Sequence, residues 1–139
     1  MRGVPPVDII GLSMSPSTEP FWQAATEHRL VVPRCTSCGT FRLPPSPFCF
    51  NCRAQEVEWI DHDGAGEIYS FTILHRAGRP GFDADVPYVV ALVELEEGPR
   101  VLTRIADVEP NDVRIGQPVR AAFVAYGDFA IPVFGAAAR

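Results

Sequence analysis

All four cysteines of the chain lie between residues 35 and 52, in two C-x-x-C pairs, Cys35/Cys38 and Cys49/Cys52, separated by ten residues. Thiols in this pattern could form disulfides, act as a redox pair or bind one metal ion. A C-x-x-C turn presents two thiolates to one ion, and ten intervening residues allow the second pair to meet the first. A redox C-x-x-C needs only one pair, at a helix start after a strand, and neither pair has that setting. The spacing therefore predicts a single metal ion bound by four thiolates.

Zinc is the metal that this ligand set favours, with iron in a rubredoxin-like site as the alternative, because both accept four sulfur ligands. Four protein ligands leave no open position for water, so the predicted site is structural rather than catalytic. Such an ion can contribute roughly 10 kcal/mol to the folding of a small ribbon. Gly39 follows the first pair, where a left-handed backbone is useful, whereas Arg53 holds the matching place after the second. We therefore expect a less regular turn at the second pair.

The cysteine segment is positive within an acidic protein. The formal net charge is -5, and all twelve basic residues are Arg. Residues 28–55 contain four Arg and no acid, so the rest of the chain has eight Arg against seventeen acids, a net charge of -9. The four are Arg29, Arg34, Arg42 and Arg53. They either balance the negative charge of the thiolates or form a docking surface for phosphate or an acidic partner.

The composition disfavours nucleic-acid binding and catalysis by this chain alone. Phosphate binding needs clustered basic residues, and residues 56–139 carry seven Arg against fourteen acids. His28, His62 and His75 stand in no recognisable nucleophile-base pattern. Contact between nucleic acid and the four Arg of the cysteine segment remains an alternative.

No run of residues approaches the roughly 20 apolar positions needed to span a bilayer. The first residues, MRGVPPVDII, lack the apolar core and cleavage site of a signal peptide. Both observations favour a cytoplasmic protein, where paired cysteines bind metal more often than they form disulfides. A length of 139 residues fits one compact domain, or a small domain with an appendage.

Few elements are needed to position the cysteines. Residues 1–17 lack periodicity and are expected to form an extended arm, after which Ser17 or Thr18 can cap a short helix that runs to residue 29. Phe21 and Trp22 in this helix either pin it to its own domain or anchor a partner, because aromatic residues dominate interface hot spots.

The rest of the chain reads as strands, and the fold class is mainly β. Residues 30–35 and 40–45 are strand-like and flank the first cysteine pair. A five-stranded Greek-key barrel of the OB type follows, with a hairpin joining its second and third strands. The predicted barrel strands are 67–75, 87–96, 100–106, 117–127 and 129–135.

The segment HRAGRPGFDADVPY, residues 75–88, joins the first two predicted barrel strands and is long for such a connection. It is either a solvated loop closed by an Arg–Asp pair or a contact loop. In the second case Arg76 or Arg79 meets a CoA phosphate or a partner carboxylate, with His75 and Phe82 as further contact candidates.

These features together resemble a known family, the DUF35 proteins, in which a rubredoxin-like zinc ribbon precedes an OB-fold. The likeness covers about residues 18–135 and rests on FW, RLVVPRCTSCGTFRLPP, EVEW, GAGEIYSFT, PYVVALVELEEGPRVLTRI and IGQPV, in that order. The family pattern has Pro inside the second C-x-x-C and Gly after it, where this chain has Phe50 and Arg53. The resemblance implies an N-terminal arm and helix at 1–29, the ribbon at 30–58 and the barrel at 59–139.

The resemblance also implies a function that spacing alone could not indicate. Such proteins are non-catalytic accessory subunits that bind and complete a thiolase-superfamily acyl-CoA enzyme of aldolase or thiolase type, including enzymes of steroid side-chain degradation. They help to form the partner's acyl-CoA site, and the thioester chemistry belongs to the partner. The alternatives are a partner of a hotdog-fold enoyl-CoA hydratase, or a stand-alone OB module that binds CoA esters or nucleic acid.

Overall fold

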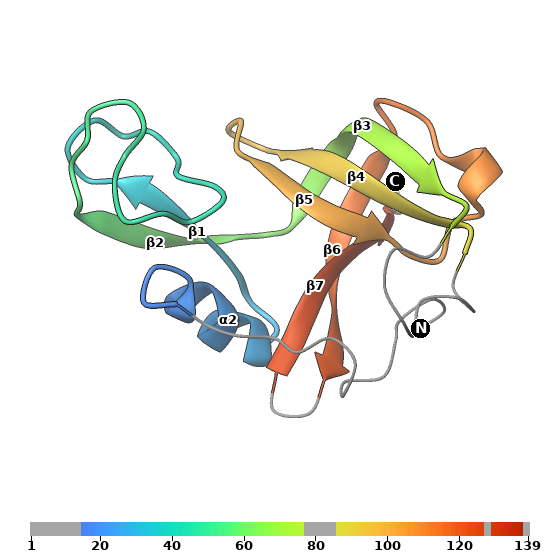
Figure 1. Ribbon diagram of the computed structural model, residues 1–139, viewed down its shortest axis with the longest axis horizontal. Helices are drawn as coiled ribbons and strands as arrows, with labels where there is room; N and C mark the ends of the chain where they lie inside the picture. The colour runs from blue at the N-terminus through green and yellow to red at the C-terminus, as the bar shows by residue number, and fades with distance from the viewer. Residues whose placement is uncertain (1–14, 77–85, 127–128, 138–139) are drawn as a thin grey trace.

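The computed structural model describes residues 15–76, 86–126 and 129–137. Two parts are visible in Figure 1, a ribbon with a short helix beside it and a barrel into which the chain then runs. The elements of the first part are α2 (Glu19–Thr26), β1 (Leu30–Cys35) and β2 (Val57–His62). Those of the barrel are β3 (Ala65–Leu74), β4 (Tyr88–Leu95), β5 (Arg100–Ile105), η1 (Pro110–Asp112), β6 (Pro118–Tyr126) and β7 (Phe129–Ala136).

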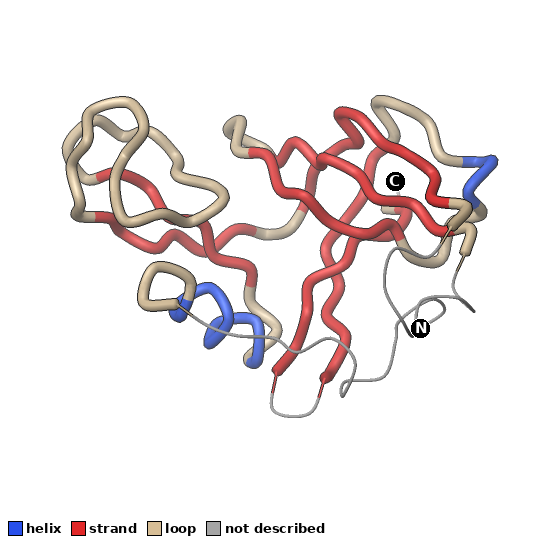
Figure 2. Tube along the Cα trace, in the orientation of Figure 1, coloured by secondary structure: helices blue, strands red, loops and turns tan. Residues whose placement is uncertain are grey.

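The five barrel strands close in the order β3-β4-β5-β7-β6, and β6 pairs with β3 to complete the ring. Every pairing is antiparallel except β5 with β7, which run parallel where Ile105 lies opposite Phe134. This order confirms the mainly β fold with an OB-like barrel, and each of the five predicted barrel strands is present. Figure 2 shows how little helix the described chain contains.

The barrel core follows from the alternation of β4. Val89, Ala91, Val93 and Leu95 are buried and point inward, while the residues between them are half-buried. Successive side chains of a strand face opposite sides, so one apolar series fills the barrel. Phe134 of β7, which is fully buried, joins the same cluster.

The helix α2 ends three residues before the predicted limit of residue 29. His28 adopts a left-handed backbone with φ 59°, and the N–H groups of His28 and Arg29 donate to the carbonyls of Ala25 and Ala24. This is a Schellman termination, which satisfies carbonyls at the end of a helix. At the start, Thr18 is the capping residue as predicted, but its hydroxyl bonds to Ser15 and makes no side-chain cap.

The second strand of the ribbon differs from the prediction. Residues 40–45 form no strand, and only an isolated bridge joins Phe41 to Arg34. Instead β1 pairs antiparallel with β2 over its whole length, from Leu30 opposite His62 to Cys35 opposite Val57. The prolines of the 40–45 segment lack the N–H that a ladder needs, whereas β2 can donate along its length.

The joint between ribbon and barrel is built around His62. Its Nδ1 accepts a hydrogen bond from the Gly64 N–H at 2.9 Å, so its Nε2 carries the proton and donates to the Glu96 carbonyl at 3.2 Å. Gly64 takes φ +82°, and its carbonyl accepts from the Ala121 N–H of β6. His62 is therefore a structural histidine that ties the end of β2 to the turn between β4 and β5.

Candidate metal centre and partner surface

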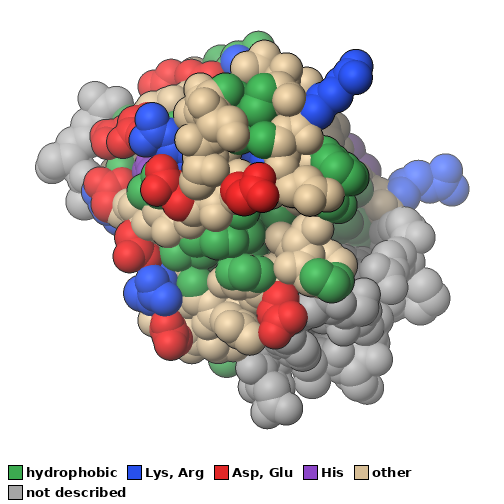
Figure 3. Space-filling model, turned by 90° about the vertical axis from the view of Figure 1, so that its left-hand side faces the viewer, with side chains coloured by type: hydrophobic (Ala, Val, Ile, Leu, Met, Phe, Trp, Pro, Cys, Tyr) green, Lys and Arg blue, Asp and Glu red, His purple; other side chains and the backbone are tan. Residues whose placement is uncertain are grey.

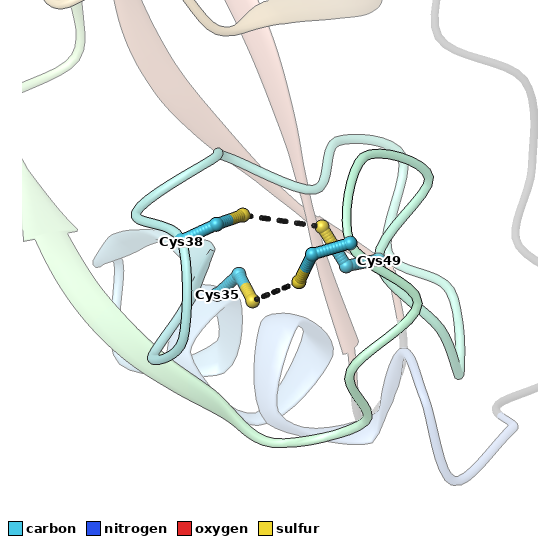
Figure 4. A group of neighbouring side chains, drawn as sticks. Cys35, Cys38 and Cys49 are labelled. Carbon is cyan, nitrogen blue, oxygen red and sulfur yellow. Dashed lines mark hydrogen bonds between the residues drawn. The ribbon is translucent and has the colours of Figure 1, made fainter.

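The four cysteines converge at the tip of the ribbon. Their sulfur atoms all lie within 4.8 Å of one another, and Figure 4 shows three of them turned toward a common point. The Sγ atoms of Cys35 and Cys52 are 3.5 Å apart, and those of Cys38 and Cys49 are 3.6 Å apart. A tetrahedral ion with metal–sulfur bonds of about 2.3 Å places its sulfur ligands about 3.8 Å apart. The cluster therefore fits one metal ion, and these separations are far too long for disulfide bonds.

The two C-x-x-C turns, which we call knuckles, have the same backbone. In the first, the Cys35 N–H donates to the Thr40 carbonyl and the Gly39 N–H donates to the Cys35 carbonyl. In the second, the bonds run from Cys49 to Ala54 and from Arg53 to Cys49. Arg53 takes φ 67°, close to the 78° of Gly39. The expectation of a less regular second turn is therefore wrong, because Arg53 adopts the left-handed backbone that glycine adopts at the matching place.

Polar neighbours stabilise the thiolate form of the first pair. The Thr40 hydroxyl lies 3.1 Å from Cys38 Sγ and the Asn51 amide donates to it at 3.5 Å, and these contacts lower the pKa of Cys38 to about 5. The backbone N–H of Cys38 is the main cause that lowers the pKa of Cys35. A thiolate is the form that binds metal.

The thiol of Cys52 holds its proton more tightly than those of Cys35 and Cys38. The backbone N–H of Ala54 lowers the pKa of Cys52, but the hydrogen bond to Cys35, burial and the other thiols together raise it to about 12. A bound cation must displace this proton, so metal binding at the site releases protons.

Arg42 is one of the four Arg of the cysteine segment, and the sequence did not indicate that it is buried. Its side chain is only 1% exposed, and its guanidinium donates to the carbonyls of Ser46, Ala54 and Gln55 at 2.9 to 3.1 Å. Its Nε is buried without a partner among the described residues. A buried cation in the ribbon suits the charge-balance interpretation, since four thiolates on a divalent ion carry about -2. The only signal in the sequence was that a basic segment surrounds the cysteines.

Two of the other three Arg of this segment engage local partners. Arg29 forms a 2.6 Å ion pair with Asp61 across the ribbon and a second with Glu27. Arg34 donates to the Gly39 carbonyl, so its charge lies at the first knuckle.

The predicted contact residues Phe21 and Trp22 lie together. Their rings meet edge to face with centroids 5.1 Å apart, and both are half-buried. They line an apolar cavity of about 550 Å³ between α2 and the barrel, with Leu43, Leu92 and Leu102 among its other walls. Leu102 is 70% exposed. Figure 3 shows hydrophobic side chains gathered on the face that the ribbon and α2 present.

The other contact candidates do not share this cavity. His75 and Arg76 are exposed and follow β3, which ends on the side of the barrel away from α2 (Figure 1). Arg79 and Phe82 lie outside the described residues. Of the remaining histidines, His28 stacks on Phe123 at 5.5 Å and so packs α2 toward β6.

Comparison with known proteins agrees with this architecture. Residues 22–58 match the family model of the ChsH2 rubredoxin-like zinc ribbon domain, and residues 59–124 match that of the ChsH2 C-terminal OB-fold domain. The solved structure described as "Ltp2-ChsH2(DUF35) aldolase" superposes with a TM-score of 0.81 at 34% identity, covering 91% of this chain and 99% of that one. Within the described residues, no helix is long and apolar enough to cross a membrane.

Curated relatives carry several names. The chain is 40% identical, over 82% of its length, to a probable enoyl-CoA hydratase alpha subunit of Thermomonospora curvata, but it spans only 36% of that relative. It is 32% identical, over 52% of its length, to the benzoylsuccinyl-CoA thiolase subunit BbsA of Geobacter metallireducens, of which it spans 47%. It is 41% identical, over 68% of its length, to a DUF35 domain-containing scaffold protein of Methanocaldococcus jannaschii, of which it spans 67%. The chain therefore belongs to the DUF35 family, whose members join a ChsH2-type zinc ribbon to an OB-fold domain.

Proposed function

We propose that this chain is a non-catalytic accessory subunit that binds and completes a thiolase-superfamily acyl-CoA enzyme, with an aldolase as the first choice. One observation carries the proposal. The chain aligns with 99% of the DUF35 chain described with an Ltp2 aldolase, at 34% identity and a TM-score of 0.81. We expect two chains this similar over their whole length to share a type of partner.

The apolar cavity beside Phe21 and Trp22 supports a partner in physical terms. Large apolar side chains that remain accessible in a soluble domain mark interaction sites, and Leu102 at this cavity is 70% exposed. The loop with His75, Arg76, Arg79 and Phe82 is proposed as a second contact, toward the partner or toward the acyl-CoA that it holds. The nucleophile and the acid-base groups for the thioester reaction then come from the partner.

Zinc is the metal that we propose for Cys35, Cys38, Cys49 and Cys52. When bound it neutralises thiolates and cross-links the two knuckles, and four protein ligands leave it no place for substrate. Its role is therefore to hold the ribbon in a fixed shape. We propose that the ribbon comprises residues 30–58, between the arm and helix at 1–29 and the barrel at 59–139.

Co-purification tests this function. The tagged chain is purified from its native lysate, and the co-eluting proteins are identified by mass spectrometry and weighed as a complex. We expect a stoichiometric thiolase-superfamily enzyme whose acyl-CoA cleavage is faster with the chain than without it. A chain that elutes alone, and that leaves the activity of such an enzyme unchanged, would overturn the proposal.

A second candidate rests on the 40% identity to a probable enoyl-CoA hydratase alpha subunit. In that case the co-eluting protein is a hotdog-fold hydratase, and the complex hydrates an enoyl-CoA. Titration of CoA esters and of a labelled oligonucleotide against the purified chain tests the remaining alternative of a stand-alone binding module. Salt-sensitive oligonucleotide binding would support the nucleic-acid version.

A further inference from the structure

Two phenylalanines protrude from the loop that carries the second knuckle, which we define as residues 46–55 and call the second-knuckle loop. Phe48 is 54% exposed and Phe50 is 76% exposed, and they flank Cys49, which is buried. Four large hydrophobic side chains in the described part of the chain are at least 54% exposed, and two of them lie here within three residues. Isolated exposed apolar residues are normal, whereas adjacent ones mark an interaction site.

The second-knuckle loop is held rigidly. The buried Arg42 guanidinium donates to the Ser46 carbonyl at one end of the loop and to the Ala54 and Gln55 carbonyls at the other. Within the loop the Ser46 hydroxyl donates to the Phe48 carbonyl at 2.8 Å, and the two cysteines belong to the metal centre. Side chains on a preorganised loop lose little conformational entropy on binding, which favours affinity.

The first knuckle provides an internal comparison. It makes the same backbone hydrogen bonds as the second knuckle. At the positions of Phe50 and Arg53, however, it has Thr36 and Gly39. The turn therefore requires neither an aromatic residue nor an arginine. Arg53 even occupies a left-handed position, φ 67°, that favours glycine. A residue kept in a disfavoured conformation where the fold does not need it suggests a function.

The charge of the loop indicates the chemistry of its partner. Arg53 is exposed, and no acidic side chain pairs with it among the described residues. The chain from residue 28 to residue 55 contains no acid at all. Aromatic residues, Phe among them, and Arg are enriched in protein–protein interfaces relative to the rest of the surface.

We propose that the second-knuckle loop docks on the acyl-CoA enzyme, with Phe48 and Phe50 in an apolar pocket of that enzyme and Arg53 against a carboxylate at the pocket rim. This inference rests on the proposed function and names the surface that would carry it. It places a main contact at the metal-bound tip of the ribbon, apart from the cavity beside Phe21.

The test replaces the two distinctive residues by those of the first knuckle. The double variant F50T/R53G is titrated calorimetrically against the enzyme recovered by co-purification, beside the unchanged chain. We expect its affinity to fall by roughly 30-fold or more, as for loss of an interface hot spot. I115T is the matched control, because Ile115 is 70% exposed but lies on the barrel, and its affinity should stay within about twofold of the unchanged chain.

Two further measurements make the result decisive. Metal content and thermal unfolding should match those of the unchanged chain, and if F50T/R53G loses metal the single variants F48S and R53G take its place. Raising the salt concentration should weaken binding of the unchanged chain more than that of R53G, since an exposed ion pair is screened.

The outcomes separate the two proposals. If F50T/R53G and its replacements bind the enzyme as tightly as the unchanged chain does, the docking inference is wrong and the accessory function stands. If the unchanged chain binds no acyl-CoA enzyme, the accessory function is wrong and the inference fails with it.

Discussion

At the scale of single residues, Arg42 links the chemistry of the metal centre to the shape of the ribbon. It donates to three carbonyls of the loop, those of Ser46, Ala54 and Gln55, and it brings a positive charge into a ribbon that holds four cysteines. The Ala54 carbonyl accepts from Arg42 and from the Cys49 N–H, so the guanidinium also supports the second knuckle directly.

Replacing Arg42 by Ala should therefore destabilise the ribbon strongly. The carbonyls of Ser46, Ala54 and Gln55 lose the Arg42 donor, and a cavity is left where its buried side chain lay. We therefore expect the free energy of unfolding to fall by about 3 kcal/mol. Denaturant unfolding of the metal-loaded protein measures this change. Arg114→Ala is the control, because Arg114 also donates to backbone carbonyls, of Asn111 and Val113, but is exposed. Equal effects of the two substitutions would contradict the role assigned to Arg42.

The cysteine ligand set followed from the sequence, whereas Arg42 did not, for a physical reason. Cysteine is a typical metal ligand and the C-x-x-C spacing is local, so the four ligands can be recognised in the sequence. The partners of Arg42 are carbonyls as far away as Gln55, and backbone carbonyls have no residue type that a sequence could reveal. The same holds for His62, whose acceptor is the carbonyl of Glu96.

At the scale of elements, the ribbon shares part of its core with the barrel, and we expect its cysteine loops to depend on the proposed metal. Leu30 and Val32 of β1 belong to the same buried cluster as the barrel residues Val89 and Phe134. Among the described residues, that buried cluster contains none between Val32 and Ile68, although Phe41 and Leu43 pack against it. We therefore expect the ion and Arg42 to hold the cysteine loops.

Replacement of Cys49 by Ser should remove the metal and unfold the cysteine loops. Cys49 is buried, and loss of one of four thiolates removes much of a binding free energy on the order of 10 kcal/mol. Mass spectrometry measures the metal content, and Trp59 fluorescence reports on unfolding of the ribbon. Prolonged treatment of the unchanged chain with a strong chelator should cause the same two changes. Thr36→Ser, at an exposed position of the first knuckle, should keep a full complement of metal. A Cys49→Ser protein with full metal content would refute the four-ligand assignment.

The close pairing of β3 with β4 needs a glycine at position 66. A Cβ there would lie 2.6 Å from the Glu94 carbonyl oxygen and 2.9 Å from a Val93 methyl group. Because backbone must move to relieve this overlap, we expect Gly66→Ala to cost about 2 kcal/mol of unfolding free energy. Gly135→Ala is the comparison, since a Cβ at position 135 would lie 3.3 Å from its nearest neighbour, the Ala106 carbonyl oxygen. We expect Gly135→Ala to unfold at a clearly higher temperature than Gly66→Ala.

The barrel was more predictable than the ribbon. Strands such as β4 alternate buried and half-buried residues, and that period is written in the sequence. The 40–45 segment also looked like a strand, but which segment pairs with β1 is decided by tertiary contact. Residues 57–62 pair with β1 because each of them has a backbone N–H to donate, and the pairing runs from Leu30 to Cys35.

At the scale of the whole molecule, the contact candidates divide over separate regions. The ribbon tip presents Phe48 and Phe50, and the cavity between α2 and the barrel presents Trp22 and Leu102. His75 and Arg76 follow the end of β3, on the side of the barrel away from α2. A partner that covered the first two would bury much of the exposed apolar surface on the ribbon side. This arrangement agrees with the proposed accessory function, in which the chain covers part of a larger enzyme.

The cavity can be tested separately from the ribbon tip, because Trp22 and Trp59 are the only tryptophans of the chain. In a Trp59→Phe protein the emission comes from Trp22 alone, and we expect it to shift to shorter wavelength when the enzyme covers the cavity. In an otherwise unchanged chain, Trp22→Ala should weaken binding of the enzyme by about 2 kcal/mol, as for an aromatic hot spot. The matched reporter is Trp22→Phe, whose remaining Trp59 monitors the ribbon. If Trp22 emission stayed constant at saturating enzyme, the cavity would lie outside the interface, and the half-buried pair Phe21 and Trp22 would serve only to pin α2 to its own domain.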